Sequence, residues 1–181
     1  MQILRSSFIS LSLLFFSIMN ASAYAENRAG ALAFTLGGGY DYFSSKREMQ
    51  NTGIPFVALG YSFTKTWGIE GLLGSFRTNF NNSVHDTRNI DGNMFAIDVI
   101  YRFLPYRFME PHLLAGVGVM GFDPNRNDAH NQGNVNVGIG TDLFIDQSIA
   151  FLVEARDFYT IVGGKNDVFV DAGIKFLLDI C

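Results

Sequence analysis

From about residue 29 onward, apolar and polar side chains alternate with a period of two, which is typical of β-strands and not of helices. Clusters of Gly, Asn, Asp and Pro divide the alternation into eight segments. The predicted strands are residues 29–43, 54–64, 67–78, 92–103, 111–122, 134–145, 149–159 and 168–178. Strands of soluble proteins usually have ~5–6 residues. Ten residues tilted by about 40° rise roughly 25 Å, the height of the apolar band of an outer-membrane barrel.

The connections between these segments alternate in length. Longer polar loops are predicted at 44–53, 79–91, 123–133 and 160–167, and shorter turns at 64–66, 104–110 and 146–148. Bacterial outer-membrane barrels have long extracellular loops and short periplasmic turns. The sequence therefore predicts an all-β fold, an eight-stranded antiparallel up-and-down transmembrane β-barrel with both termini on the periplasmic side.

The two faces of each predicted strand differ in chemistry. One phase is bulky, apolar and uncharged, as in Phe95, Ile97 and Val99, and is interrupted only by Gly38, Gly71 and Thr141. The residues of the other phase are small, polar or charged. A soluble barrel would need large apolar side chains inside, but eight strands enclose little more than their own side chains. We therefore expect the bulky phase to face lipid and the interior to lack room for many large side chains.

Aromatic residues gather near the predicted strand ends. Amphipathic rings are favoured at the headgroup level of a membrane, so this placement predicts two aromatic girdles. The upper girdle comprises Tyr40, Tyr42 and Phe43, and the lower girdle comprises Tyr61, Phe63, Trp67, Tyr101 and Phe103.

The inward phase carries a set of charges of both signs, to which His112 adds a further base. The predicted interior charge network is Asp41, Glu70, Asp98, Arg102, Asp142, Glu154, Arg156, Asp171 and Lys175. Unpaired buried charges are costly, so we expect most pairs to form across strands, with Glu154 and Arg156 close enough to pair within one. The network either lines a polar pore or proton path or fills the barrel with salt bridges. The small interior favours the filled barrel.

The first 25 residues have the pattern of a secretory signal peptide. Arg5 precedes a 12-residue apolar core at 8–19, and Ala23-Tyr24-Ala25 places small residues where a signal peptidase acts. A membrane anchor needs about 20 apolar residues, more than this core has. The predicted organisation is a signal peptide at 1–25, cleaved before Glu26, and a barrel domain at 26–181.

Composition excludes several other classes of protein. The apolar content of 48% is too high for a disordered chain, and a net charge of −4 without a basic patch argues against nucleic-acid binding. The one cysteine, Cys181, allows neither an internal disulfide nor a cysteine metal site. His85 and His130 lie in predicted loops without the spacing of a catalytic triad or a metal motif. We predict no catalytic residue, metal or cofactor.

The chain resembles the OmpA-like transmembrane domains of the outer-membrane β-barrel domain family. The resemblance covers 26–181 and is carried by the segments Ala31–Tyr42, Trp67–Ser75 and Pro111–Gly118. The closing segment is similar to the barrel-assembly signal of that family, with matches at Asp171, Gly173, Phe176 and Leu178. Members of that family often end on an aromatic residue, whereas this chain continues through Asp179, Ile180 and Cys181. We expect no peptidoglycan-binding domain after the barrel and hence no wall-anchoring role.

This resemblance implies an integral protein of a Gram-negative outer membrane with a non-enzymatic structural or surface-interaction role. The implied partners are outer-membrane lipid and lipopolysaccharide, the barrel-assembly machinery, and a host or surface ligand bound by the extracellular loops. Two alternatives stay open. A lipid-modifying or proteolytic barrel enzyme would bring a Ser or Asp beside a His at the outer rim, and a small-solute channel would need a continuous polar lumen.

Overall fold

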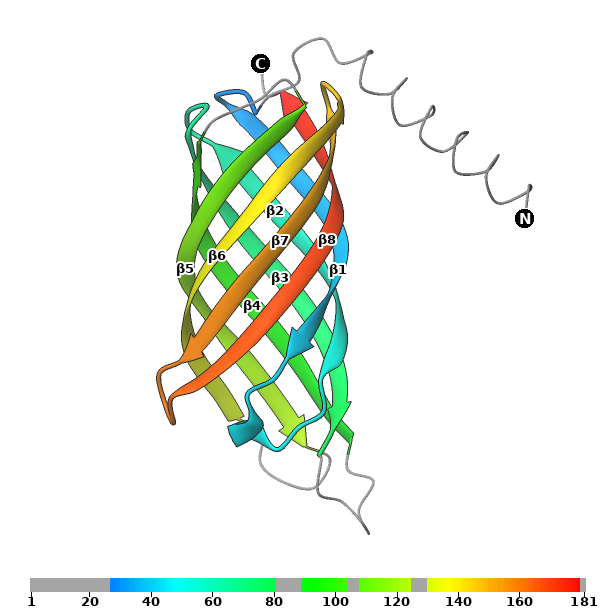
Figure 1. Ribbon diagram of the computed structural model, residues 1–181, viewed down its shortest axis with the longest axis vertical. Coiled ribbons are helices and arrows are strands. Elements are labelled where there is room, and N and C mark those ends of the chain that lie inside the picture. Colours follow the sequence, from blue (N-terminus) through cyan, green and yellow to red (C-terminus); the bar gives the residue numbers. More distant parts are fainter. Residues whose placement is uncertain (1–26, 81–88, 104–107, 125–129, 180–181) are drawn as a thin grey trace, which may run out of the picture.

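The computed structural model describes residues 27–80, 89–103, 108–124 and 130–179, in which eight antiparallel strands close into one barrel (Figure 1). This confirms the predicted fold class. The strands are β1 (Ala31–Tyr42), β2 (Thr52–Ser62), β3 (Trp67–Asn79), β4 (Asn89–Arg102), β5 (Met109–Pro124), β6 (His130–Asp146), β7 (Ile149–Thr160) and β8 (Lys165–Asp179). One short 3₁₀ helix, η1 (Ser45–Arg47), follows β1. No helix among the described residues is long and apolar enough to span a membrane.

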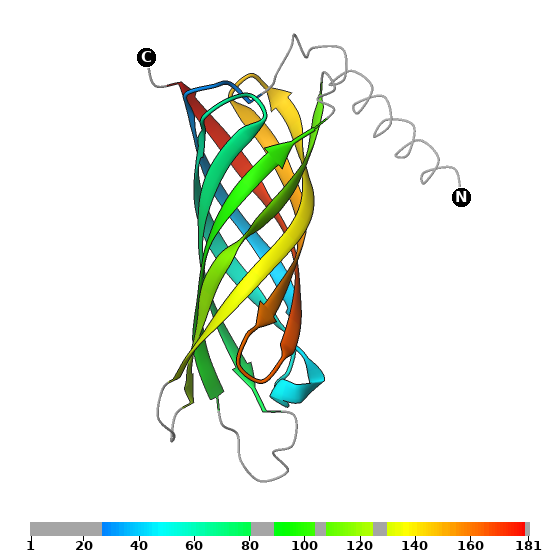
Figure 2. The same ribbon diagram turned by 90° about the vertical axis from the view of Figure 1, so that its left-hand side faces the viewer.

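The barrel closes where the first and last strands meet. Leu32 on β1 is in register with Tyr61 on β2 and with Leu178 on β8. The start of β1 and the end of β8 lie at the same end as the short β2–β3 and β6–β7 turns, whereas η1 and the β7–β8 turn lie at the other end (Figures 1 and 2). Short turns and both chain ends mark the periplasmic end of such barrels, so η1 is on the extracellular side.

Five strands, β2, β4, β5, β6 and β8, begin earlier than their apolar pattern predicts, and β6 and β8 show why. β6 starts at His130 instead of residue 134, and β8 starts at Lys165 instead of residue 168. These added residues are polar, yet Asn131 still pairs with Gly121 and Lys165 with Thr160. Backbone pairing continues above the lipid, where water and not hydrocarbon surrounds the outer face, so hydrophobic alternation ends before the strand does.

The bulky apolar phase faces outward on all eight strands, as predicted. Leu59, Val117 and Val137 are each at least 60% exposed to the barrel's surroundings. At the periplasmic end, the rings of Trp67 and Tyr101 lie 4.8 Å apart. Such a surface is unstable in water, and it suits the hydrocarbon core of a membrane.

The prediction that Phe43 belongs to the upper girdle is wrong. Tyr40 and Tyr42 form an exposed ring pair at 5.1 Å, but Phe43 is buried, 5.5 Å from the ring of Phe76. The chain leaves β1 at Tyr42 and turns over the barrel mouth, which carries Phe43 inward.

The prediction of an interior without many large side chains is also wrong for the extracellular half. An apolar cluster, here called the apolar plug, fills it with Phe43, Met49, Ile54, Phe56, Ala58, Leu72, Phe76, Ile90, Met94, Ala96, Met120, Phe122, Phe158 and Phe169. Glycines on neighbouring strands make the room. A Cβ at Gly37 would lie 2.5 Å from the ring of Phe56, and one at Gly39 would overlap the ring of Phe169.

Candidate functional site: the charged lumen and the extracellular mouth

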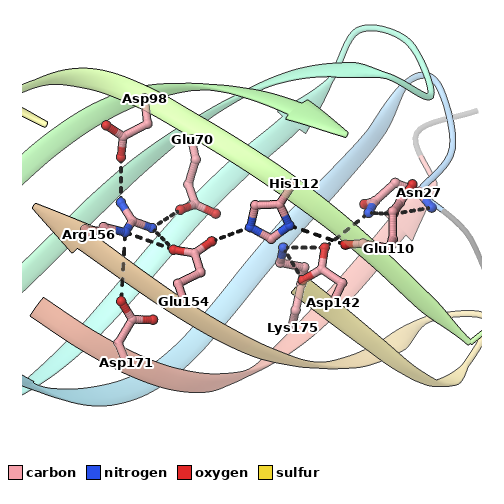
Figure 3. A network of polar contacts seen from close by, with 10 residues as sticks. All are labelled: Asn27, Glu70, Asp98, Glu110, His112, Asp142, Glu154, Arg156, Asp171 and Lys175. Atoms are coloured by element: carbon pink, nitrogen blue, oxygen red, sulfur yellow. Dashed lines mark hydrogen bonds and ion pairs between the residues drawn. The ribbon is translucent and has the colours of Figure 1, made fainter. Parts of the chain in front are cut away.

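Below the apolar plug, the lumen is organised around the guanidinium of Arg156 on β7 (Figure 3). It donates hydrogen bonds to Asp98 on β4 at 2.6 Å and to Glu70 on β3 at 2.8 Å. It also donates to Glu154 at 2.9 and 2.5 Å, and its Nε lies 3.8 Å from Asp171 on β8. These five side chains are at least 97% buried. One cation therefore joins four strands across the lumen.

Glycines on the inward face of β5 and β6 give these charges their space. A Cβ at Gly116 would collide with Asp98 Oδ1, and one at Gly140 would lie 2.6 Å from His112 Nε2. Gly116 pairs in register with Asp98, and Gly138 and Gly140 pair with Arg156 and Glu154, so each of these long charged side chains lies beside a glycine of the next strand. Both kinds of residue are needed to place several carboxylates around one guanidinium.

A second group of polar contacts continues toward the periplasmic end (Figure 3). His112 Nε2 lies 2.7 Å from Glu154 Oε1, and Lys175 donates to both oxygens of Asp142 at 2.7 and 2.8 Å. The Asn27 amide donates to Glu110 and to Asp142. Asn27 thereby covers the periplasmic end of the charged lumen.

The structure buries all nine charges of the predicted interior set but does not bring all of them together. Seven belong to the network of Figure 3. Arg102 lies in register with His112 and close enough to Glu110 to interact with it electrostatically, but its Nε and Nη1 bond to no described residue. Asp41 lies at the opposite end, with neither carboxylate oxygen hydrogen-bonded within the described ranges.

At the extracellular mouth, Arg47 on η1 reaches across the lumen in what we call the Arg47 clamp. It donates to Asp167 at 2.8, 2.8 and 2.5 Å, to Thr160 at 2.7 Å and to Gln132 at 2.8 Å. Its guanidinium also lies over the ring of Phe122, 4.9 Å from the centroid. The clamp ties the β1–β2 connection to β6, β7 and β8, and its side chains are buried at the mouth.

Sequence reasoning missed Arg47, Asp167, Asn27 and Glu110. Arg47 and Asp167 fell in predicted polar loops, where a charge normally faces water. Asn27 precedes the first alternating segment, so no periodicity applies to it. Glu110 could have been found, because it shares the inward phase with His112 two residues further along.

The arrangement of the described lumen is that of a filled core. Ion pairs occupy the periplasmic half, the apolar plug occupies the extracellular half, and the Arg47 clamp covers the mouth. His112 is fully buried against Glu154, and His130 stacks on Phe122 at 5.6 Å. No group of three or more His, Cys, Asp or Glu side chains in the described ranges could hold a metal ion. His85 and Cys181 lie outside those ranges.

A closed eight-stranded barrel with an apolar outer face and a charged, filled lumen defines an integral outer-membrane barrel protein of a Gram-negative bacterium. The chain belongs to the outer membrane protein beta-barrel domain family, whose model matches residues 8–176. No curated protein matches the chain in sequence.

Solved structures with similar folds include the N-terminal barrel domain of Pseudomonas aeruginosa OprF, with a TM-score of 0.61 and 16% identity over 83% of this chain and 100% of that one. Neisserial surface protein A matches with a TM-score of 0.65 and 12% identity, covering 83% and 99%. The attachment invasion locus protein Ail of Yersinia pestis matches with a TM-score of 0.57 and 16% identity, covering 83% and 99%. At these identities the likeness shows the fold.

The signal peptide and its cleavage before Glu26 lie outside the described residues and stay predictions. The barrel-assembly signal is likewise untested. In the structure Asp171 and Gly173 point inward, whereas Phe176 and Leu178 are exposed on the outer face of β8.

Proposed function

We propose that this barrel is a non-enzymatic surface-interaction protein, in which a filled lumen holds the extracellular ends of the strands in fixed positions. The observation that carries the proposal is the Arg47 clamp. It fastens the β1–β2 connection over the mouth through one buried guanidinium with three different partners. A segment needed only to join two strands would not require this anchoring, whereas a binding platform gains from it because less flexibility is lost on binding.

One group of basic side chains at the extracellular end, beside the Arg47 clamp, favours an anionic partner. Lys46 is exposed and held by a 2.8 Å bond to the carbonyl of Gly164, and Lys165 and His130 line a cavity of about 90 Å³ beside Arg47. Glu48 is the exposed acid of the same segment. The Yersinia pestis Ail barrel has been solved in complex with the heparin analogue sucrose octasulfate. We propose a sulfated or phosphorylated glycan as the class of surface ligand for this chain.

Binding of fluorescent heparin to cells displaying the barrel tests this proposal. We expect the double substitution Lys46→Glu and Lys165→Glu to weaken binding about ten-fold, or ~1.4 kcal/mol. Lys65→Glu is the control, because it makes one such exchange of lysine for glutamate, half the charge change of the double variant, in the periplasmic β2–β3 turn. Unchanged binding by the double variant, or an equal loss in the control, would overturn the proposed ligand class.

Conductance in planar bilayers tests the filled lumen. The purified, refolded barrel should produce no stepwise current, because an ion would have to pass the Arg156 network and the apolar plug in turn. Steady single-channel steps would instead favour a small-solute channel. Release of fatty acid from lipid A, or cleavage of a peptide, by the pure barrel would contradict the non-enzymatic part of the proposal.

A further inference from the structure

A groove crosses the outer surface of the barrel. Three adjoining hollows of about 710, 730 and 550 Å³ all contact Pro55 on β2. The first lies beside Val153, Val170 and Gly38, over β7, β8, β1 and β2. The second continues from β1 across to Asn131 on β6, and the third lies over β2 to β5. We call their continuous course the outer-face groove.

Small side chains at consecutive outward positions create this groove. Gly38 pairs with Pro55 in one row of the sheet, and further along that row Ser75 pairs with Asn93 and Asn93 with Gly121. The adjacent row toward the periplasm is bulky and forms one wall: Leu36, Val57, Leu73, Phe95 and Val119. Gly38 is one of the positions at which the outward apolar phase is interrupted, so this part of the groove is visible in the sequence.

The two ends of the groove differ in polarity. Toward the middle of the membrane its lining is apolar, with Val153, Val170 and Ala172. Toward the extracellular side it meets hydroxyl and amide groups of Ser75, Asn93 and Asn131. Next to them Arg77 donates to Asp91 at 2.6 Å, and both side chains are at least half exposed. The groove therefore runs from the depth of the hydrocarbon to the level of lipid headgroups.

We propose that the outer-face groove binds one molecule of an outer-leaflet glycolipid, with an acyl chain over Gly38 and Pro55 and a phosphorylated sugar headgroup against Asn93, Asn131 and Arg77. An empty hollow in this position would leave its apolar lining without contacts, and hydrocarbon is the apolar material at that depth. Strands are ~4.8 Å apart, so the apolar stretch of the groove from Val153 on β7 to Ser75 on β3, which crosses five strands, spans roughly 20 Å, comparable with a fatty acyl chain.

The polar end selects the kind of lipid. Amide and hydroxyl groups both donate and accept hydrogen bonds, as sugar hydroxyls require. A guanidinium fits the geometry of a phosphate. A glycerol phospholipid offers the phosphate but few hydroxyls, so a lipid with a phosphorylated sugar uses more of the groups present. This inference concerns the lipid-facing wall and stands independently of the surface ligand proposed above.

Native mass spectrometry of the refolded full barrel, released from mixed micelles containing equal lipid A and phosphatidylglycerol, tests the inference. We expect one lipid A to be retained by the wild type. Gly38→Leu and Gly53→Leu should each lower retention at least about ten-fold by filling the groove. A Cβ at either glycine meets only one backbone oxygen at 3.9 Å, so the barrel has room for the change.

Gly71→Leu is the matched control, because Gly71 also faces outward, a Cβ there meets nothing within 4 Å, and it lines none of the three hollows. It should retain lipid A as the wild type does. Equal retention by Gly38→Leu, or equal loss by Gly71→Leu, would overturn the groove as the binding site.

Two further measurements test which lipid headgroup the groove binds. Asn93→Ala with Asn131→Ala should reduce the preference for lipid A over phosphatidylglycerol while leaving gel mobility of the folded barrel unchanged. Equal retention of the two lipids by the wild type would overturn the sugar-headed ligand. Heparin binding by displayed Gly38→Leu should stay at the wild-type level, which separates this test from that of the surface ligand.

Discussion

Arg156 is the residue on which the charged lumen depends most. Its guanidinium is the hydrogen-bonding partner of Glu70, Asp98 and Glu154, which come from three strands. Removing one member of a buried ion pair leaves an uncompensated charge, which is far more costly than the net stabilisation from the intact pair. The consequences of losing Arg156 should therefore exceed those of losing any surface arginine.

We predict that Arg156→Met destabilises the barrel by about 3–5 kcal/mol. Urea unfolding in lipid vesicles, followed by the fluorescence of Trp67, would measure it. Arg77→Met is the control, since Arg77 pairs with Asp91 on the exposed extracellular face and the pair is screened by solvent. Similar unfolding midpoints for Arg156→Met and the wild type would show that the lumen charges do not hold the strands together.

At the scale of single residues, the sequence predicts which charged side chains face the lumen better than it predicts which of them pair with one another. The inward phase of each strand was sufficient to name Asp98, Arg156 and Lys175, because alternation assigns a face without knowledge of the fold. The partners depend on the register of strands far apart in the chain, such as Arg156 with Asp98. The Arg47–Asp167 contact is harder still, because it forms only when a loop folds back over the mouth.

Among the elements, β1 shows how one glycine run serves both faces of a strand. Gly37 and Gly39 leave interior room for Phe56 and Phe169, whereas Gly38 leaves the hollow on the outside. The alternation along the sequence predicted the outward phase correctly. The argument that eight strands leave no room for large side chains was applied to the whole interior. The argument failed where glycine on one strand makes room for phenylalanine on the next.

We predict that alanine substitutions at two neighbouring glycines of β1 differ in their effect on the stability of the barrel. Gly39→Ala should destabilise the barrel by about 1–3 kcal/mol, because its methyl group overlaps the ring of Phe169. Gly38→Ala, one residue away in the same strand, should be nearly neutral. Unfolding in urea distinguishes them, and equal stability of the two variants would contradict the interior packing.

The face assignment of β4 can be tested at two adjacent positions. Val99 is 50% exposed and Asp98 is fully buried. Val99→Arg should therefore cost about 2–4 kcal/mol in a bilayer. In a Cys181→Ser background, Val99→Cys should react with a lipid-soluble thiol reagent and Asp98→Cys should not. The reverse pattern would mean that the register is shifted by one residue, which exchanges the two faces.

For the molecule as a whole, closure is the property from which stability in detergent follows. β1 pairs with β8 along its entire length, from Ala31 with Asp179 to Tyr42 with Val168, so the barrel has no free edge. The ends are also joined by an ion pair of 2.5 Å between Arg28 and Asp179. With every strand paired on both sides, backbone groups within hydrocarbon are satisfied internally, and local fraying has no starting edge.

We therefore predict heat-modifiable migration in gel electrophoresis. The folded barrel should keep its closed, compact form in dodecyl sulfate without boiling and migrate differently from the boiled chain. Circular dichroism of the unboiled sample should show β-structure that is lost on boiling. Arg156→Met should convert to the unfolded form at a lower temperature than the wild type, because the lumen core and the closed sheet unfold together. Identical migration of boiled and unboiled samples, with no β-signal, would contradict the barrel itself.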